Sequence, residues 1–496
     1  MNQSQDLALI IRSRVPLVVI GSHEEHHVLD MIRRLSEQLG RPMYSWTVTN
    51  GVKCHDPTYR MQSADPRTAE PAMLLQHIQG IRTPGIFVLC DFHPYLENAP
   101  QLVRALKEIA LGYEYLGHTI LLVSARIELP EELAPFSARF EMPMPDAAEL
   151  EQIIREEAAR WTREHDGVKV VTHRSTLDRL TRALGGLPVT DARRLARNAI
   201  YNDGAITESD LPEINKAKFE LLGMDGMLGF EYETESFGNV GGLRRLKQWL
   251  RQREPAFAGD PAAAGLDPPR GILLLGVQGS GKSLAAKATA GVWGVPLLRL
   301  DFGALYDKFF GESERNLRNA LKTAEVMAPC VLWVDEIEKG LSLGDNEGGT
   351  SRRVLGALLT WMADRPAPVF LVATANDISS LPPELVRKGR LDEIFFVDLP
   401  AEEIRMEIFR IHLNRRNQDP SNFDLSKMAR ATEGFSGAEI EAAVVAGLYS
   451  AVARKESLST DHLLTEIANT RPLSVVMAEQ VDHLRRWAEP RTVPAD

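Results

Sequence analysis

The segment GVQGSGKS, residues 276–283, has the glycine, lysine and serine spacing of a phosphate-binding loop. It follows the apolar run GILLLG and precedes a good helix former, which is the context that such a loop requires. Its glycines allow positive φ values that turn backbone N–H groups inward, Lys282 supplies a cation for the β and γ phosphates, and Ser283 offers a ligand for Mg²⁺. A chance glycine turn is the alternative. The expected contacts to the nucleotide are Gly276, Gly279, Ser280, Gly281, Lys282, Ser283 and Leu284.

Two carboxylates end a second apolar run, CVLWVDE. Buried charge at the carboxyl end of a strand is costly unless it meets a metal or a substrate. We expect Asp335 to hold magnesium through water and Glu336 to polarise the attacking water. In phosphoryl transfer, the placement of water, metal and charge provides most of the rate enhancement.

A third apolar run ends in VATAN, so Asn376 would lie beside the two carboxylates if the strands are neighbours. Its amide could then orient the water, although an isolated asparagine is more often a loop cap. Farther along, Arg387 and Arg390 in LVRKGRLDE are candidates for positive charge supplied to a neighbouring subunit's transition state. A solvated basic loop is the alternative reading.

Short apolar strands alternate with helical patterns through the whole chain, which predicts parallel α/β sheets covered by helices. The six expected strands occupy residues 16–21, 85–92, 119–125, 271–276, 330–336 and 369–376. Each half then continues into an acidic, proline-containing edge and a glycine turn that opens a helix. We interpret this as a diverged tandem repeat of one architecture, although two unrelated α/β domains would look similar.

The first half lacks the phosphate-site residues, because SHEEHHVLD follows its first strand where a glycine-lysine loop would be needed. His23, Glu24 and His27 satisfy the H-E-x-x-H spacing of zinc proteases. We expect instead a surface helix start, with Ser22 and Glu25 forming a capping box and an apolar stripe behind it. The expected stripe is Val28, Ile32, Leu35 and Leu39.

Composition limits the remaining classes of function. The 496 residues suggest two to four domains, and 44% hydrophobic with 25% charged residues is the mixture of a packed globular protein. A net charge of −11 argues against nucleic acid as the main partner. Three distant cysteines fit neither a disulfide framework nor a thiolate zinc site, and no run reaches the roughly 18 apolar residues of a membrane span. We therefore expect a cytoplasmic protein without membrane attachment.

From about residue 237 to 470 the chain resembles the AAA ATPases. The matching segments, in order, are FGNVGG, GVQGSGKS, KFFGESERNLR, VLWVDE, ATAND, VRKGRLDEIF and GFSGAEI. Val277 and Gln278 stand where most AAA proteins have two prolines. With the degenerate repeat in front, the chain is similar to the poorly characterised AAA ATPases of algal chloroplasts and cyanobacteria.

The resemblance implies further roles. Val240 and Gly241 would lie along the adenine, with Asn239 replacing the usual aspartate, and Gly437 and Ala438 would approach the nucleotide from a helical lid. Arg390 matches the family's arginine finger. Where many members have a second arginine three residues later, this chain has a glutamate, which implies fewer charges for activation between subunits.

The segment KFFGESE matches the loop that lines the central pore of hexameric AAA machines, with Phe309 at the aromatic position and Phe310 and Gly311 beside it. An aromatic ring can grip an extended peptide whatever its sequence, whereas core burial is the alternative for either phenylalanine. The same segment favours a ring. The arginine finger does so independently, because it acts only when another subunit receives it.

These observations predict a P-loop α/β sheet with a helical lid, preceded by a degenerate AAA-like α/β domain. The expected segments are 1–215 without a nucleotide site, a linker at 216–236, the large subdomain at 237–400, and the lid with a C-terminal helix at 401–496. The expected activity is Mg-dependent ATP hydrolysis in a homohexameric ring, coupled to remodelling of a macromolecular client, most simply a protein. A nucleotide-gated scaffold with slow hydrolysis is the alternative, and nucleic-acid translocation is a weaker third.

Overall fold

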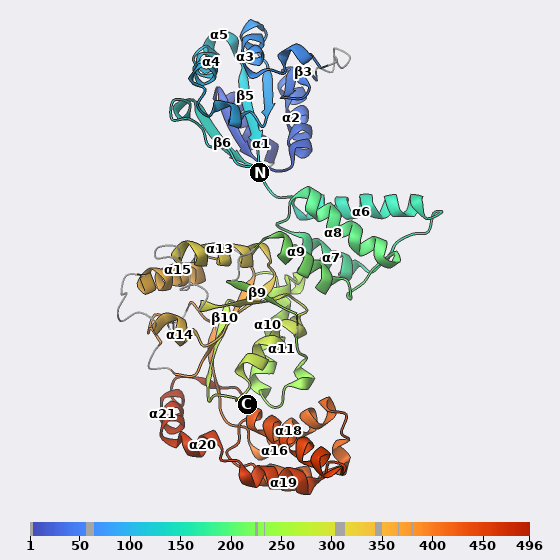
Figure 1. Cartoon of the computed structure of the whole chain (residues 1–496), viewed down its shortest axis with the longest axis vertical. Coiled ribbons are helices and arrows are strands. Elements are labelled where there is room, and N and C mark those ends of the chain that lie inside the picture. Colours follow the sequence, from blue (N-terminus) through green and yellow to red (C-terminus); the bar gives the residue numbers. More distant parts are fainter. Residues whose placement is uncertain are drawn as a thin grey trace. The chain divides into compact units, whose positions relative to one another are not determined.

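The computed structural model describes the chain apart from residues 1–2, 56–63, 224–226, 233, 303–312, 343–349, 366, 378–380, 386 and 388. Its contacts divide the chain into two compact units (Figure 1). Unit 1 comprises Met1–Arg155 and Leu187–Arg194, and unit 2 comprises Glu156–Gly186 and Leu195–Asp496. This division differs from the boundaries expected at residues 215, 236 and 400, which stay a prediction.

Unit 1 is built around a six-stranded sheet with the order β3-β2-β4-β5-β1-β6. All pairs in it are parallel except that of β2 with β3. The strands are β1 (Leu17–Gly21), β2 (Met43–Thr47), β3 (Gly51–Cys54), β4 (Ile86–Cys90), β5 (Thr119–Ser124) and β6 (Ser137–Glu141). The three strands expected in this half are therefore confirmed as β1, β4 and β5, and β2, β3 and β6 are additions.

Helices cover both faces of this sheet. One core joins alternate strand residues to α1 and α2, and the other joins the intervening strand residues to α3 and α4. Every residue of β4 and β5 is buried, as expected for a parallel sheet with two covered faces. The helices are α1 (Gln3–Arg12), α2 (Glu25–Leu39), α3 (Pro71–Gly80), α4 (Pro100–Leu111) and α5 (Tyr113–Leu116).

Unit 2 contains a seven-stranded sheet with the order β15-β14-β10-β13-β12-β11-β9. Only β9 pairs antiparallel, on β11. The strands are β9 (Leu228–Glu231), β10 (Gly271–Gly276), β11 (Leu297–Leu300), β12 (Cys330–Val334), β13 (Val369–Ala375), β14 (Glu393–Val397) and β15 (Val493–Pro494). The three strands expected here are confirmed, and the sheet extends to the end of the chain through β15.

Two layers of helices enclose the second sheet. One core joins it to α10 and α11, and the opposite core joins it to α13 and α15. The helices are α10 (Arg244–Ala258), α11 (Lys282–Trp293), α13 (Ser313–Val326), α14 (Ile337–Ser342) and α15 (Thr350–Asp364). The predicted class, a parallel-rich α/β sheet, is therefore present in both units.

The two sheets share one strand order. In unit 1, β1 lies between β5 and β6, with β4 and β2 beyond β5; in unit 2, β10 lies between β13 and β14, with β12 and β11 beyond β13. In chain order, β1 and β10 are each the first parallel strand of their sheet. The parallel strands of the two sheets are therefore connected in the same sequence as well as arranged in the same spatial order. This topology supports the predicted tandem repeat.

Helical segments follow each sheet. The first consists of α6 (Ala147–Glu164), α7 (Arg174–Leu184), α8 (Val189–Asp203) and α9 (Leu211–Leu221), with the short pair β7 (Val171–Thr172) and β8 (Ala205–Ile206). The second is the expected helical lid and C-terminal helix, which are α16 (Glu402–Arg415), α17 (Leu425–Ala431), α18 (Gly437–Arg454), α19 (Thr460–Asn469), α20 (Leu473–Val476) and α21 (Ala478–Ala488). The helices α16–α19 share their own hydrophobic core.

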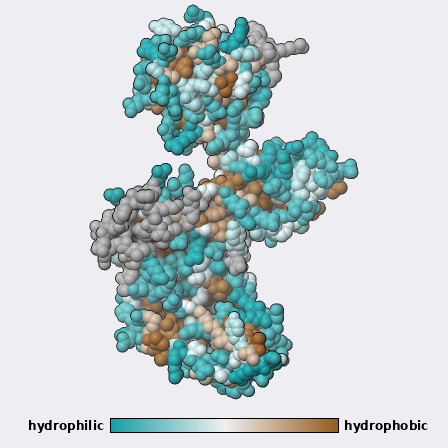
Figure 2. Space-filling view, in the orientation of Figure 1, coloured by the Kyte–Doolittle hydropathy of each residue, from teal (hydrophilic) through white to brown (hydrophobic). Residues whose placement is uncertain are grey.

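The surface in view is largely hydrophilic, with hydrophobic patches between polar regions (Figure 2). Within the described ranges, no helix is long and apolar enough to cross a membrane.

Candidate functional site: a phosphate loop facing two carboxylates

The predicted phosphate-binding loop is a strand-turn-helix junction. All residues of β10 are buried up to Gly276, and α11 begins at Lys282. Gly279 and Gly281 have φ values of 76° and 97°, which glycine adopts without the strain of a side chain. A Cβ on Gly276 would collide with the carbonyl oxygen of Val397 on the adjacent strand. At each of these three loop positions, the backbone conformation or the close neighbouring strand therefore favours glycine.

Lys282 lies in this loop with only 6% of its surface exposed. Its Nζ donates hydrogen bonds of 2.8 Å to the carbonyl oxygens of Gly276 and Val277. Burial lowers its pKa to about 8, although the nearby carboxylates Glu338, Asp335 and Glu336 oppose the shift. A buried ammonium with two carbonyl partners is suited to exchange those partners for phosphate oxygens.

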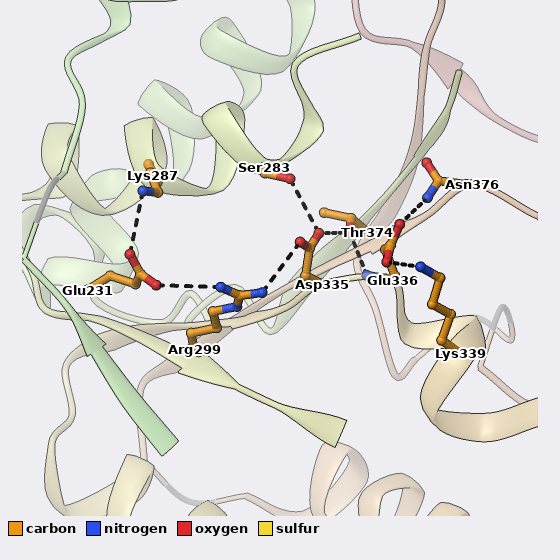
Figure 3. A network of polar contacts seen from close by, with 9 residues as sticks. All are labelled: Glu231, Ser283, Lys287, Arg299, Asp335, Glu336, Lys339, Thr374 and Asn376. Atoms are coloured by element: carbon orange, nitrogen blue, oxygen red, sulfur yellow. Dashed lines mark hydrogen bonds and ion pairs between the residues drawn. The ribbon is translucent and has the colours of Figure 1, made fainter. Parts of the chain in front are cut away.

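Asp335 directly follows the buried strand β12 and faces the start of α11 (Figure 3). Its Oδ1 accepts a hydrogen bond of 2.6 Å from Thr374 Oγ1 and one of 3.3 Å from Ser283 Oγ. The predicted pair of magnesium ligands, Ser283 and Asp335, is thus brought together across two elements. Hydroxyl and carboxylate oxygens are the donors that Mg²⁺ prefers.

Glu336 is held from two sides. Asn376 Nδ2 donates to its Oε1 at 2.9 Å, and Lys339 Nζ lies 2.5 Å from its Oε2 (Figure 3). Its backbone has a φ of 47°, and its N–H donates to Thr374 Oγ1 at 2.9 Å. Because β12 and β13 are parallel neighbours, Asn376 lies beside the carboxylates as the sequence predicted.

These groups line one cleft with a volume of about 410 Å³. The lid reaches it directly, since Ala438 N donates to Gly279 O at 3.1 Å. Of the predicted residues, those that line it are Val240, Gly241, Gly279, Ser280, Gly281, Lys282, Ser283, Leu284, Asp335, Glu336, Asn376, Gly437 and Ala438. The sheet, the loop and the lid therefore bring together side chains that are far apart in sequence.

Sequence reasoning missed several residues of the cleft. Thr374 bridges Asp335 and Glu336, and its position two residues before Asn376 places it on the same face of β13, a signal that was available. The wall contributed by α16, which includes Ile408, Ile411 and His412, carries no motif. Burial lowers the pKa of His412, which keeps this wall weakly charged despite the nearby carboxylate of Glu441.

Glu338 is a further buried acid, two residues after Glu336. It accepts a hydrogen bond of 2.9 Å from Asn376 N, and burial raises its pKa. It therefore fixes the backbone from which the Asn376 amide projects.

Other predicted site residues lie elsewhere. Among the described residues that line the cleft, neither Arg387 nor Arg390 is present. Arg387 is exposed, and Arg390 donates to the carbonyl oxygen of Glu384. Phe309, Phe310 and Gly311, the predicted pore loop, lie outside the described residues.

The predicted capping box at Ser22 and Glu25 is wrong. The helix α2 begins at Glu25 with Glu24 as its N-cap, and Ser22 Oγ instead accepts from Glu24 N at 3.0 Å. The expected stripe is present, since Val28, Ile32 and Leu35 are buried. The Glu24 carboxylate of the H-E-x-x-H segment accepts from Thr190 N and Oγ1 at 2.6 and 2.5 Å. In the described parts of the chain, no group of three or more His, Cys, Asp or Glu is placed to hold a metal.

Fold and cleft together define a protein of the AAA ATPase class. The model of the ATPase family associated with various cellular activities matches residues 272–399, and the AAA+ lid model matches 422–466. Two further models match the front of the chain: the N-terminal domain of SpoVK-like AAA ATPases at 3–142 and their second domain at 148–225.

Full-length relatives narrow the family. A protein of Trieres chinensis is 34% identical over 98% of this chain and 97% of its own length. Those of Pyropia yezoensis and Guillardia theta are 35% and 33% identical, each over 98% of this chain, with 98% and 95% of their own lengths covered. All three are described as "Uncharacterized AAA domain-containing protein ycf46". The chain belongs to this family of AAA domain proteins.

Proposed function

We propose that this protein binds ATP with Mg²⁺ in the cleft and hydrolyses it. The cleft supplies a buried ammonium at Lys282 and a glycine-rich loop at the start of α11, where backbone N–H groups can bind phosphate. Ser280 Oγ is buried and has no hydrogen-bond partner among the described residues, which a phosphate oxygen would provide. Ser283 and Asp335 present oxygens that fit Mg²⁺, which when bound with ATP neutralises charge on the phosphates.

Glu336 is the group that accepts a proton from the attacking water. Asn376 occupies one of its oxygens at 2.9 Å and so restricts the orientation of the carboxylate toward the cleft. The Asp335 carboxylate stays beside Ser283 because Thr374 donates to it. One arrangement supports the proposal most strongly. Glu336, oriented by Asn376, and Asp335, a carboxylate suited to Mg²⁺, are consecutive residues that line the same cleft as Lys282 of the phosphate-binding loop.

Glu336→Gln tests this directly. The glutamine keeps the shape and the contact with Asn376 but is a poor base, so phosphate release should fall by about 10²–10⁴-fold while ATP still binds. Binding would be followed with a fluorescent ATP analogue. Lys282→Ala is the control that should lose binding as well. Hydrolysis at the native rate in the Glu336→Gln protein would overturn the assignment.

We further propose that the active form is a homo-oligomeric ring, most simply a hexamer, in which Arg390 and Arg387 act on the neighbouring subunit's cleft. Both lie outside the lining of their own chain's cleft, and a transition-state arginine can act from another subunit. A ring of this kind would couple hydrolysis to remodelling of a client, which we propose is a protein, in the cytoplasm.

The ATP-trapped Glu336→Gln protein provides the route to this client. A trapped state should retain the bound partner, so proteins recovered with it but not with Lys282→Ala are candidates. Phe309→Ala then separates threading from scaffolding: a threading motor would lose client processing and keep basal ATPase activity, whereas a nucleotide-gated scaffold would lose neither.

A further inference from the structure

Arg299 on β11 lies between two carboxylates at the metal side of the cleft. Its two terminal nitrogens are each 4.0 Å from an acid, Nη1 from Glu231 Oε1 and Nη2 from Asp335 Oδ2 (Figure 3). The guanidinium also lies over the ring of Trp333, 5.0 Å from its centroid. Neither the phosphate loop nor the hydrolytic carboxylate requires this arginine, so its position needs another explanation.

The two oxygens of Asp335 have different surroundings. Oδ1 receives the hydroxyl hydrogens of Thr374 and Ser283, whereas Oδ2 faces Arg299. A divalent cation that approaches this carboxylate therefore meets a positive charge already placed beside it. Like charges at such a distance repel, and the repulsion is only partly screened because the Asp335 side chain is 26% exposed.

Glu231 offers the guanidinium a second partner. It lies on β9, which pairs antiparallel with β11, so both side chains project from one small ribbon. Lys287 of α11 also contacts Glu231, at 3.5 Å. The result is a line of alternating charges in which Glu231 and Asp335 share Arg299.

We propose that Arg299 sets the affinity of the cleft for its divalent cation by competing for Asp335, and that Glu231 weakens this competition by drawing the guanidinium away. The inference rests on the proposed Mg-dependent nucleotide site. Arg299 is a positioning residue here, because it acts through Asp335 and is not among the described residues that line the cleft.

The inference predicts shifts of opposite sign for the two partners of one ion pair. Arg299→Gln removes the competitor, so less Mg²⁺ should be needed. Glu231→Gln releases Arg299 fully to Asp335, so more Mg²⁺ should be needed. In the double variant the effect of Glu231→Gln should vanish, because its target is gone. Loss of a distant negative charge alone would instead raise the requirement equally in both backgrounds.

The experiment is a binding titration that does not depend on turnover. Full-length protein is mixed with a fluorescent ADP analogue, and the Mg²⁺ concentration that gives half of the fluorescence change is measured. Arg299→Gln should lower this midpoint by about two- to tenfold, and Glu231→Gln should raise it by about the same factor. Arg299→Lys keeps the charge and should stay nearer the native midpoint than Arg299→Gln.

Thermal unfolding midpoints show whether the variants remain folded. The Arg299 side chain is 45% exposed, so its replacement should be tolerated. Unchanged midpoints for Mg²⁺, or shifts of the same sign in both single variants, would overturn the inference while leaving the ATPase proposal intact. A native protein that binds the nucleotide analogue with no response to Mg²⁺ would overturn the metal part of the proposed function, and the inference with it.

Discussion

Ser124 Oγ donates a hydrogen bond of 2.6 Å to Asp91 Oδ1 in unit 1, where the paired strands β4 and β5 end. Cys90 pairs with Val123 in that sheet, as Val334 pairs with Ala373 in unit 2. The next residues are Asp91 and Ser124 in one sheet, and Asp335 and Thr374 in the other, where the hydroxyl-carboxylate distance is also 2.6 Å. Unit 1 therefore retains a hydroxyl-carboxylate pair, Ser124 and Asp91, at the position that Thr374 and Asp335 occupy in the nucleotide site of unit 2.

The loop that would complete such a site is absent from the β1–α2 connection, the corresponding position in the described part of unit 1. Only Ser22, His23 and Glu24 separate β1 from α2, with no lysine and no glycine among them. Instead, the Glu24 carboxylate accepts hydrogen bonds from Thr190 in the first turn of α8. The N-terminus of a helix is electropositive and can bind a phosphate, and here the Glu24 carboxylate occupies such a position at α8.

Nucleotide stoichiometry should therefore be one per chain. Asp91→Ala should leave both the stoichiometry and the affinity for ATP unchanged, because unit 1 lacks a phosphate loop. Lys282→Ala should abolish detectable binding, since it removes the cation of the other loop. Calorimetric titration with ADP and Mg²⁺ would measure both. A second nucleotide that survives in Lys282→Ala would contradict this assignment of the two units.

Asn376→Ala should reduce kcat by about tenfold or more with little change in KM, because the amide orients Glu336 and a small misplacement of a catalytic group is costly. Steady-state phosphate release would measure both constants. Lys339→Gln is the matched comparison, since it removes the other side-chain contact of the same carboxylate. The Lys339 side chain is 69% exposed, and exposed ion pairs contribute little, so its effect should be smaller. Equal losses would show that the exposed ion pair with Lys339 orients Glu336 as much as the Asn376 contact does, which would contradict this expectation.

Mixing two inactive variants should restore activity if the clefts are shared between subunits. Arg390→Ala protein has an intact cleft but lacks the arginine proposed to act on the neighbouring subunit. Lys282→Ala protein keeps that arginine but has a defective cleft. A mixed ring contains some interfaces with both parts, so ATPase activity should reappear and should depend on protein concentration. Failure to restore activity, together with concentration-independent turnover by a native monomer, would exclude action in trans.

Nucleotide affinity should fall as pH rises above about 8. The pKa of Lys282 is lowered to about 8, so the free protein loses the ammonium that phosphate requires, and affinity should drop by up to about tenfold per pH unit. In the Lys282→Met protein, nucleotide affinity should not show this dependence on pH. Lys218, whose pKa burial also lowers to about 8, lies outside the cleft lining, so Lys218→Met should keep the slope.

The same shift has the opposite sign for folding. A lysine with a pKa below its unfolded value near 10.5 destabilises the fold while both states are protonated, that is, below about pH 8. This cost disappears as pH rises from about 8 to about 10.5. The stability difference between native protein and Lys282→Met should therefore change across that window, as denaturant titrations at several pH values would show.

Local patterns in the sequence were sufficient for the six expected strands and for the chemistry of the loop, but not for the other strands of the two sheets. GILLLG is β10 without a change of boundary, and Lys282, Asp335 and Glu336 all line the cleft. A phosphate loop is encoded by contiguous residues, because glycine conformations and a strand-turn-helix junction are local properties. Asn376 could be placed because the carboxyl ends of neighbouring parallel strands meet at one edge.

Contacts between distant segments could not be derived in this way. Three features depend on how separate elements pack. Ile408 and Ile411 line the cleft, Glu24 accepts a hydrogen bond from Thr190, and β15 pairs with β14 at the edge of the sheet. Apolar helix faces have no sequence label for their partners, since hydrophobic burial is non-directional. By itself, the sequence determined which residues can bind phosphate and metal. Only the tertiary structure decided which side chains surround them, and so placed Arg299 between Glu231 and Asp335.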